Sequence, residues 1–164
     1  MGLRYTKRND GVGIFVSMSQ ISVNIKKQDV FDEVTRLAEY IGAKQGDSKY
    51  YDRVSLVDED VEMLEQFFVE SKNTLIGYLH QFFISESGDA TTTILFKVSP
   101  QYNAGIVGSI SQSLAKFFVY NITAKWFSTV TKDVNVADLA TMAGKFLEDT
   151  VVKLSKKCAP IRDE

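Results

Sequence analysis

The chain has 164 residues, of which 45% are hydrophobic, 12% aromatic and 24% charged, and its net charge is −2. This length suits one domain with its own core, and two prolines and ten glycines are too few for a disordered or collagen-like chain. The charge balance is unlike that of a dedicated nucleic-acid binder, which is strongly basic. The aromatic share predicts either a thick core or a large surface for a partner.

Charge is unevenly distributed along the chain. Residues 1–28 carry five basic residues against one acidic residue, a balance of +4. Residues 29–100 carry six basic and fourteen acidic residues, which gives −8, and residues 101–164 carry eight and six, which gives +2. Two interpretations stay open: ordinary solvated faces, or complementary docking between copies of the chain or onto a partner.

The N-terminus starts basic, with Arg4, Lys7 and Arg8, but no apolar segment or cleavage pattern follows it. We therefore expect no signal peptide, and no uncharged apolar run is long enough to cross a membrane. Cys158 is the only cysteine, so an internal disulfide and a thiolate metal site are excluded. A reducing cytoplasm is the expected place of synthesis.

Residues 12–25 are rich in β-branched side chains and alternate between apolar and polar from Val16 on. This pattern predicts an extended arm or strand. We therefore treat residues 1–28 as an N-terminal arm.

Helical spacing begins after Asp29, which stands where an N-cap is expected. The apolar residues that follow share one face of a helix over residues 30–44: Val30, Val34, Leu37 and Ile41. A second helix is predicted from Asp58 to about residue 82, because carboxylates gather in its first turns, where the backbone N–H groups favour them.

The period then changes, and residues 82–85 and 91–98 flank the turn sequence Ser87-Gly88-Asp89. This predicts a β-hairpin at about 84–98. A third, strongly apolar helix is expected at about 104–130, and a fourth runs from residue 136 to about 157.

These elements predict a mainly helical α+β fold, with a four-helix bundle-like core, a β-hairpin and an extended N-terminal arm. The helical domain would cover residues 29–158 and be followed by a flexible tail at 159–164. The aromatic residues divide between the two roles. Those on helix stripes are predicted to be core, namely Phe31, Phe68, Phe82, Phe117, Phe118, Trp126 and Phe146. Four others lie outside any stripe and are left for a partner surface, namely Phe15, Tyr50, Tyr51 and Tyr102.

No pattern for catalysis or metal binding emerges. His80 is the only histidine and no Gly-x-Ser-x-Gly sequence occurs, so a Ser/His/Asp triad is not expected. The acidic residues near position 58 lack the pattern of a calcium loop, and Gly11-Val12-Gly13 lacks the context of a phosphate-binding loop. We expect no catalytic residue, no metal and no cofactor, and therefore not an enzyme.

Three segments carry a resemblance to a known family. They are Asp29-Val30-Phe31-Asp32-Glu33-Val34 at the start of the first helix, Asp58-Glu59-Asp60-Val61-Glu62-Met63-Leu64 at the start of the second, and residues 114–127 of the third, which end in Ala124-Lys125-Trp126-Phe127. In this order, and with the hairpin between them, they resemble the head–tail connector (adaptor) proteins of tailed bacteriophages over about residues 29–157.

The resemblance implies a structural virion protein. Such subunits form a homo-oligomeric ring, commonly twelvefold, in the neck between the portal and the tail. Portal and tail or neck proteins would be partners, DNA would pass through the channel without sequence-specific binding, and no membrane would be involved. The ring would be assembled in the cytoplasm of the host bacterium.

Two sets of residues are predicted to make contacts. The expected intersubunit or partner interface comprises Ile14, Phe15, Val16, Ile21, Val23, Tyr50, Tyr51, Asp58, Glu59 and Asp60. The expected electrostatic contacts with DNA or a partner are Arg4, Lys7, Arg8, Lys26 and Lys27. Two alternatives stay open: another phage neck, tail-completion or capsid-associated protein, or a small nucleic-acid-binding or regulatory module.

Overall fold

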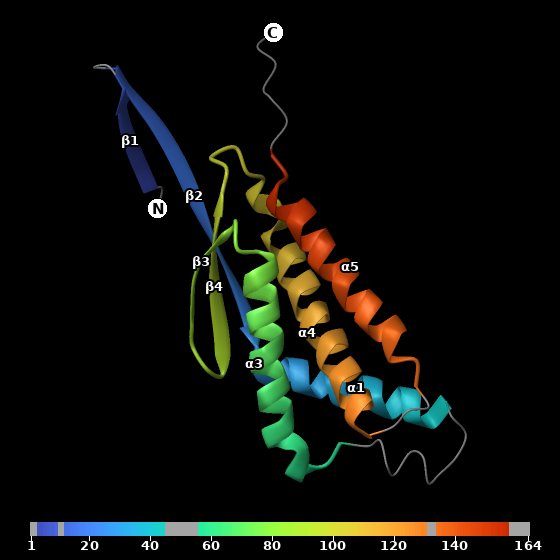
Figure 1. Ribbon diagram of the computed structural model, residues 1–164. Helices are drawn as coiled ribbons and strands as arrows, with labels where there is room; N and C mark the ends of the chain where they lie inside the picture. The colour runs from blue at the N-terminus through green and yellow to red at the C-terminus, as the bar shows by residue number, and fades with distance from the viewer. Residues whose placement is uncertain (1–2, 10–11, 45–55, 131–133, 158–164) are drawn as a thin grey trace.

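The computed structural model describes residues 3–9, 12–44, 56–130 and 134–157, and it describes side chains from Ser19 onward. These residues form a mostly helical α+β fold, in which four α-helices accompany an antiparallel sheet (Figure 1). The predicted fold class is therefore confirmed. Tyr50, Tyr51 and the predicted tail at 159–164 lie outside the described residues.

The strands are β1 (Leu3–Asn9), β2 (Val12–Lys26), β3 (Phe83–Ser87) and β4 (Thr91–Val98), in the order β1-β2-β4-β3. The long strand β2 has two different partners. Its residues 12–18 pair with β1, and its residues 19–26 pair with β4. The predicted N-terminal arm is thus divided: one half is a projecting hairpin, and the other is a strand of the main sheet.

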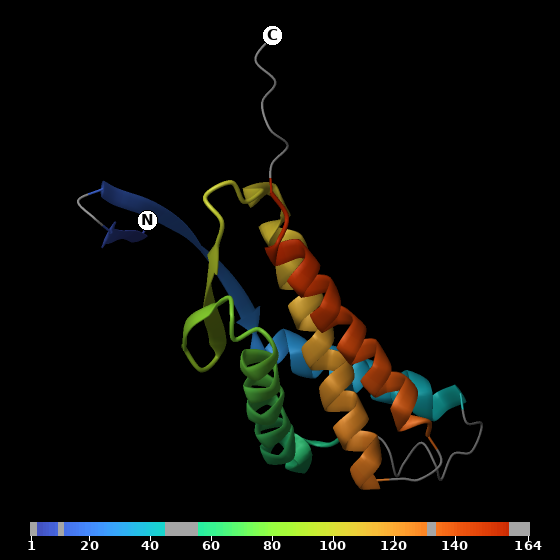
Figure 2. The same cartoon turned by 45° about the horizontal axis from the view of Figure 1, so that its top comes forward.

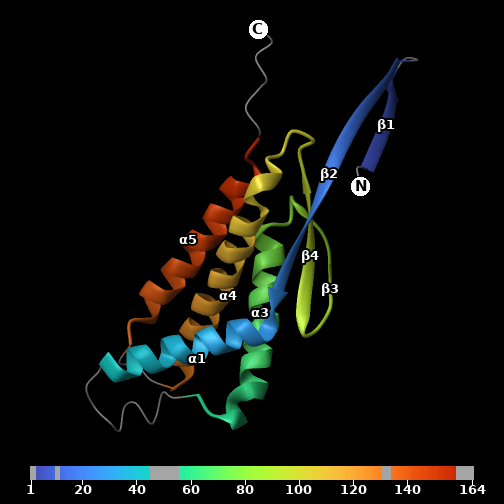
Figure 3. The same cartoon turned by 180° about the vertical axis from the view of Figure 1, so that it is seen from behind.

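The helices are α1 (Lys27–Lys44), α3 (Val61–Tyr78), α4 (Val107–Val130) and α5 (Val136–Leu154). Helices α3, α4 and α5 lie side by side with α4 in the middle (Figures 1 and 2). Helix α1 follows β2 directly and crosses the other three near the start of α3 (Figure 3). No described helix combines the length and the apolar character that crossing a bilayer requires.

Two predicted helix boundaries need correction. Helix α1 starts at Lys27, so Asp29 lies in its first turn and is not its N-cap. The second helix opens with a 3-10 turn at Asp58–Asp60 and ends at Tyr78. It cannot run to residue 82, because the chain turns there and the N–H groups of Phe82 and Phe83 both donate to the carbonyl of Leu79.

The other elements agree with the predictions. The hairpin consists of β3 and β4, and its turn contains Gly88 with a positive φ of 88°. Strand β4 alternates, with Thr92, Ile94, Phe96 and Val98 buried toward the helices. The third helix begins with a 3-10 turn at Ala104–Ile106 and continues as α4, and the fourth is α5.

Aromatic side chains occupy the centre of the core. Phe118 stacks on Phe68 with 4.6 Å between ring centroids and contacts Phe117 at 5.6 Å. Five of the seven aromatic residues predicted to be core are buried, and Phe82 and Phe146 are half-buried against the core. Tyr102 was expected at a partner surface and is instead 8% exposed, because its backbone bridges Lys157 and its ring joins the core.

Candidate interaction site

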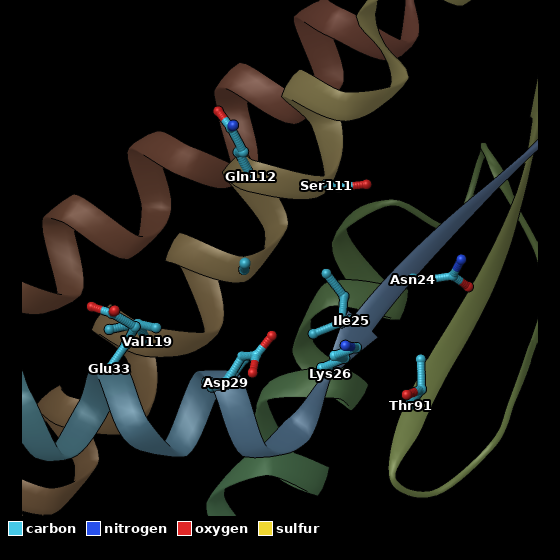
Figure 4. A pocket seen from close by; sticks show the side chains of 11 residues that line it. Asn24, Ile25, Lys26, Asp29, Glu33, Thr91, Ser111, Gln112 and Val119 are labelled. Carbon is cyan, nitrogen blue, oxygen red and sulfur yellow. The ribbon is translucent and has the colours of Figure 1, made fainter.

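An open groove lies where β2, α1 and α4 meet (Figure 4). Its volume is about 580 Å³, and a second hollow of about 440 Å³ continues it along α1 and α4. The two hollows share Glu33, Gln112, Ala115 and Val119. The lining of the larger hollow comes from β2 and the directly following α1, from Thr91 of β4 and from α4, so the hollow is a property of the tertiary fold.

The floor of the groove is apolar and its rim is charged. Ile25 and Val30 are almost fully buried beneath it, and Ala115 and Val119 of α4 are half-buried along it. Asp29 and Glu33, both exposed, project from α1 toward the hollow in Figure 4. An apolar floor with carboxylates at its rim suits an apolar segment that also carries basic residues.

One wall of the groove is an edge of β2. In Figure 4, α4 lies on one side of β2 and β4 lies on the other. Within the described residues, β1 pairs with β2 only up to Met18, so no strand pairs with the groove-side edge of residues 19–26. Unpaired strand edges are templates for pairing with another chain.

The second feature is the projecting hairpin formed by β1 and residues 12–18 of β2, which we call the ribbon. It extends away from the helices, as Figures 1 and 2 show. Its two strands are joined in the register Leu3↔Met18, Tyr5↔Val16 and Asn9↔Val12. A two-stranded ribbon without further packing is only marginally stable in water, so the ribbon is expected to gain stability from a partner.

The register divides the ribbon into two unlike faces. Residues opposite each other in an antiparallel pair share a face. One face therefore has Leu3, Tyr5, Lys7, Asn9, Val12, Ile14, Val16 and Met18, and the other has Arg4, Thr6, Arg8, Gly13, Phe15 and Ser17. The first face is mainly apolar and the second is mainly polar and basic.

The apolar face changes side along β2. From Val12 to Met18 the apolar positions are even-numbered, apart from Phe15, but in the second half they are odd-numbered, at Ile21, Val23 and Ile25. Successive residues of a strand point to opposite sides of the sheet. Because Val23 and Ile25 are buried toward the helices, the apolar ribbon face lies on the opposite side of the strand.

Two residues predicted to make contacts have internal roles instead. Val23 was predicted as an interface residue but has 0% exposure in the core. Lys27 was predicted to contact DNA or a partner, but its side chain is only 12% exposed. Its Nζ donates to Glu65 Oε2 at 2.7 Å and to Asp89 Oδ1 at 2.8 Å. The hydrogen bonds to Asp89 and Glu65 raise the pKa of Lys27, and the bond from Lys27 lowers the pKa of Asp89. Through these two bonds Lys27 links α1 to α3 and to the β3–β4 turn.

The other predicted residues are not brought into one site. Ile21 is half-buried against the core, and Lys26 is exposed at the groove. Asp58 and Glu59 are exposed, and Asp60 accepts a hydrogen bond from the N–H of Val57 at 2.9 Å. That acidic turn lies at the far end of the molecule from the ribbon (Figure 1). The ribbon contains the remaining predicted residues, Arg4, Lys7, Arg8, Ile14, Phe15 and Val16, and only their backbone is described.

Sequence reasoning did not identify the groove. Its α4 residues, such as Gln112 and Ala115, occupy ordinary helix positions and give no local signal. One signal in the sequence could have separated the two halves of the strand, namely the switch from even-numbered to odd-numbered apolar positions after Met18. His80 is exposed, with Nδ1 3.2 Å from the carbonyl oxygen of Gly77. In the part of the chain that the structure describes, no three His, Cys, Asp or Glu side chains cluster as metal ligands would.

Comparison with known proteins adds no family assignment. No protein-family model, no curated protein and no solved structure matches the chain.

Proposed function

We propose that this chain is a structural subunit of a homo-oligomeric ring, of the kind that connects head and tail in tailed bacteriophages. The ring would lie in the virion neck between the portal and the tail, and DNA would pass through its channel. The sequence resemblance over residues 29–157 suggests this role. The ribbon, whose apolar face lies on the side of β2 away from the helices, supports it.

A ring needs a contact between two different surfaces of identical subunits. Such a heterologous contact closes into a ring when the rotation between subunits is suitable. The ribbon and the groove lie at different ends of β2, and the groove offers apolar surface that another copy could cover. A subunit with a projecting ribbon and a separate groove that can receive the ribbon of a neighbour is suited to this geometry.

The test is the size and symmetry of the particles that the purified protein forms, alone and with a phage portal protein. We expect rings in negative-stain images. Val16→Asp, on the apolar ribbon face, should abolish them because it places a charge in the contact. Its control is Ser17→Asp, the next residue on the other face, which should leave rings intact. A wild-type protein that stays monomeric even with the portal protein would overturn the proposal.

A second candidate is a nucleic-acid-binding or regulatory module, and one observation favours it. The register puts Arg4 and Arg8 on the same ribbon face, and two-stranded ribbons are among the elements that read DNA. Binding of duplex DNA that weakens steeply with salt and is lost in Arg4→Ala/Arg8→Ala would support it, provided that the wild type forms no rings. Absence of DNA binding at low salt would remove it. Another neck, tail-completion or capsid-associated role would instead give an assembly that does not bind the portal.

A further inference from the structure

The hydrogen-bond pattern of β2 shows which of its residues direct their backbone N–H and C=O groups toward the open edge. Just after the strand, the N–H of Lys27 donates to the carbonyl of Ala90 in the direction of β4. In an antiparallel ladder, residues that bond to one neighbour alternate with residues that face the other side. The odd-numbered residues of β2 therefore bond to β4, and Gln20, Ser22 and Asn24 direct their N–H and C=O groups toward the groove-side edge.

The length of this edge matches that of β1. The open edge covers Ser19–Lys26, eight residues, and β1 covers Leu3–Asn9, seven residues. The edge of β1 that faces away from β2 is also unpaired by any described strand. Two unpaired edges of nearly equal length are therefore present in each copy of the chain.

The two edges of one copy cannot meet each other. Strand β1 is joined to the first half of β2 along Val12–Met18, whereas the open edge is the second half of the same strand. The groove lies beside the last residues of β2 and the start of α1, and the ribbon extends away from that end of β2, as Figures 1 and 3 show. Strand β1 of the same copy therefore cannot pair with this edge, whereas β1 of a second copy is a strand of the right length.

We propose that β1 of one copy adds as a strand to the open edge of β2 in the next copy, within the groove. The ribbon's apolar face then packs on the α4 surface at Ala115 and Val119. The ribbon's polar face continues the outer face of the acceptor sheet, where Ser22 and Asn24 are exposed. This contact rests on the proposed ring function and specifies how its subunits join.

Charge and chemistry agree with this occupant. Lys7 is the only charged residue on the apolar ribbon face, and the rim of the groove carries two carboxylates, Asp29 and Glu33, against one cation, Lys26. Main-chain hydrogen bonds along an open edge provide affinity, and side chains that fit the adjacent hollow provide specificity. The contact joins unlike surfaces, so each subunit gives its ribbon to one neighbour and receives a ribbon from the other.

Cross-linking between two cysteine variants tests the contact directly. Both variants carry Cys158→Ser, which removes the only natural cysteine. Thr6→Cys lies at the centre of β1, and Ser22→Cys lies near the centre of the open edge, so the pair is adjacent whether the added strand runs parallel or antiparallel. Mixing the two with a short bis-maleimide should give a covalent dimer that neither variant gives alone.

The matched control replaces Ser22→Cys with Ser85→Cys, an exposed serine on β3, the other edge strand of the sheet. We expect no cross-link between Thr6→Cys and Ser85→Cys. A cross-link there in place of the Ser22 pair would overturn the proposal in favour of addition to β3. Strong self-cross-linking of Val16→Cys would overturn it in favour of two ribbons stacked face to face.

A backbone variant tests the same edge without a reagent. Ser22→Pro removes an N–H that faces the groove and leaves the bonds to β4 intact, whereas Ser22→Ala keeps the N–H. With equal melting temperatures, the proline variant should assemble about tenfold less tightly, the order expected for a lost hydrogen bond and a blocked strand. Equal assembly of the two folded variants would overturn the contact.

Different results would refute the contact between β1 and β2 and the proposed ring function. Rings that form in images while the Thr6–Ser22 pair gives no cross-link would overturn the contact and leave the function standing. Absence of rings with and without the portal protein would overturn the function. A cross-link obtained in that case would still establish the contact.

Discussion

The two roles considered for Lys27, a surface contact with DNA or a partner and a structural ion pair, predict opposite effects on stability when its charge is removed. Its Nζ lies 2.7 Å from Glu65 Oε2, and its side chain is 12% exposed against 42% for Glu65. Its Nζ also lies 6.0 Å from the centroid of the Phe68 ring. Replacing Lys27 by Met keeps most of the apolar stem and removes the charge, so Lys27→Met isolates the ionic contribution to stability.

The magnitude follows from the exposure of the partners. Exposed ion pairs contribute about 0.2–1 kcal/mol, and hydrogen bonds to charged groups in drier surroundings contribute about 1.5–3 kcal/mol. Lys27 is nearly buried but Glu65 is partly solvated, so we expect Lys27→Met to lower the free energy of unfolding by about 1 kcal/mol. For a domain of this size that is about 2–4 °C in Tm. Asp89 is 98% exposed and stays hydrated in the variant, so its contact is not counted.

The assay is urea unfolding of the wild type, Lys27→Met, Glu65→Gln and the double variant. The double-mutant cycle should give a coupling of about 0.5–1 kcal/mol that shrinks as salt is added. The pKa of Lys27 is raised, so its stabilisation is complete below the unfolded pKa of about 10.4 and is lost as pH rises through the folded value. The difference between wild type and Lys27→Met should therefore narrow above about pH 10.5.

The adjacent Lys26 provides the control, because it is exposed and has no ion pair among the described contacts. Lys26→Met should change the free energy of unfolding by less than about 0.5 kcal/mol. Equal losses in the two variants, or a coupling of zero between Lys27 and Glu65, would refute the assignment of Lys27 as an internal tie. In that case its expected role as a contact for DNA or a partner would regain support.

Three further predictions concern the body of the molecule. Phe118→Ala should cost about 3–5 kcal/mol in urea unfolding, because this side chain is fully buried and stacked on another ring, and a loss under 1 kcal/mol would contradict that packing. Hydrogen bonds from Lys153 and Ser113 lower the pKa of Asp149, so its stabilisation is present above the unfolded pKa of about 3.9 and is lost as pH falls through the folded value. The difference in free energy of unfolding between wild type and Asp149→Asn should accordingly disappear below about pH 4. A difference that stays constant down to about pH 2 would exclude a stabilising interaction of Asp149 with Lys153 and Ser113. Gly88→Ala should lower Tm, at a cost of about 1–3 kcal/mol in the free energy of unfolding. The reason is that φ of Gly88 is +88° and that an added Cβ would lie 2.1 Å from the carbonyl oxygen of Thr91. An unchanged Tm would contradict this turn.

The hairpin and the helices were predictable because their signals are local. Gly88 between two β-rich runs marked the turn of β3 and β4, and the apolar spacing of residues such as Leu114, Phe118 and Ile122 marked α4. The errors fell where local signals conflict. Phe82 continues the helical spacing of α3 but lies in the turn after it, so periodicity alone extended the helix too far.

The candidate site was less predictable, because its parts come together only in the fold. The sequence predicted Ile14, Val16 and Val23 together as interface residues of one strand; Ile14 and Val16 lie in the ribbon, whereas Val23 is core. What separates them is the pairing partner, β1 for the first and β4 for the second. The groove beside β2 needs α1, α4 and Thr91 of β4 to be placed before it exists.

The sequence by itself determined the helices, the hairpin and the α+β class, because hydrophobic period, turn residues and charge at helix starts act over a few residues. It also contained the change of apolar side within β2. Only the tertiary structure decided that half of β2 belongs to the core and that an open edge of this strand borders a groove. It also decided that Lys27 forms hydrogen bonds with residues 38 and 62 positions away in the sequence. Those outcomes depend on which distant segments pack together, since burial and pairing are set by neighbours in space.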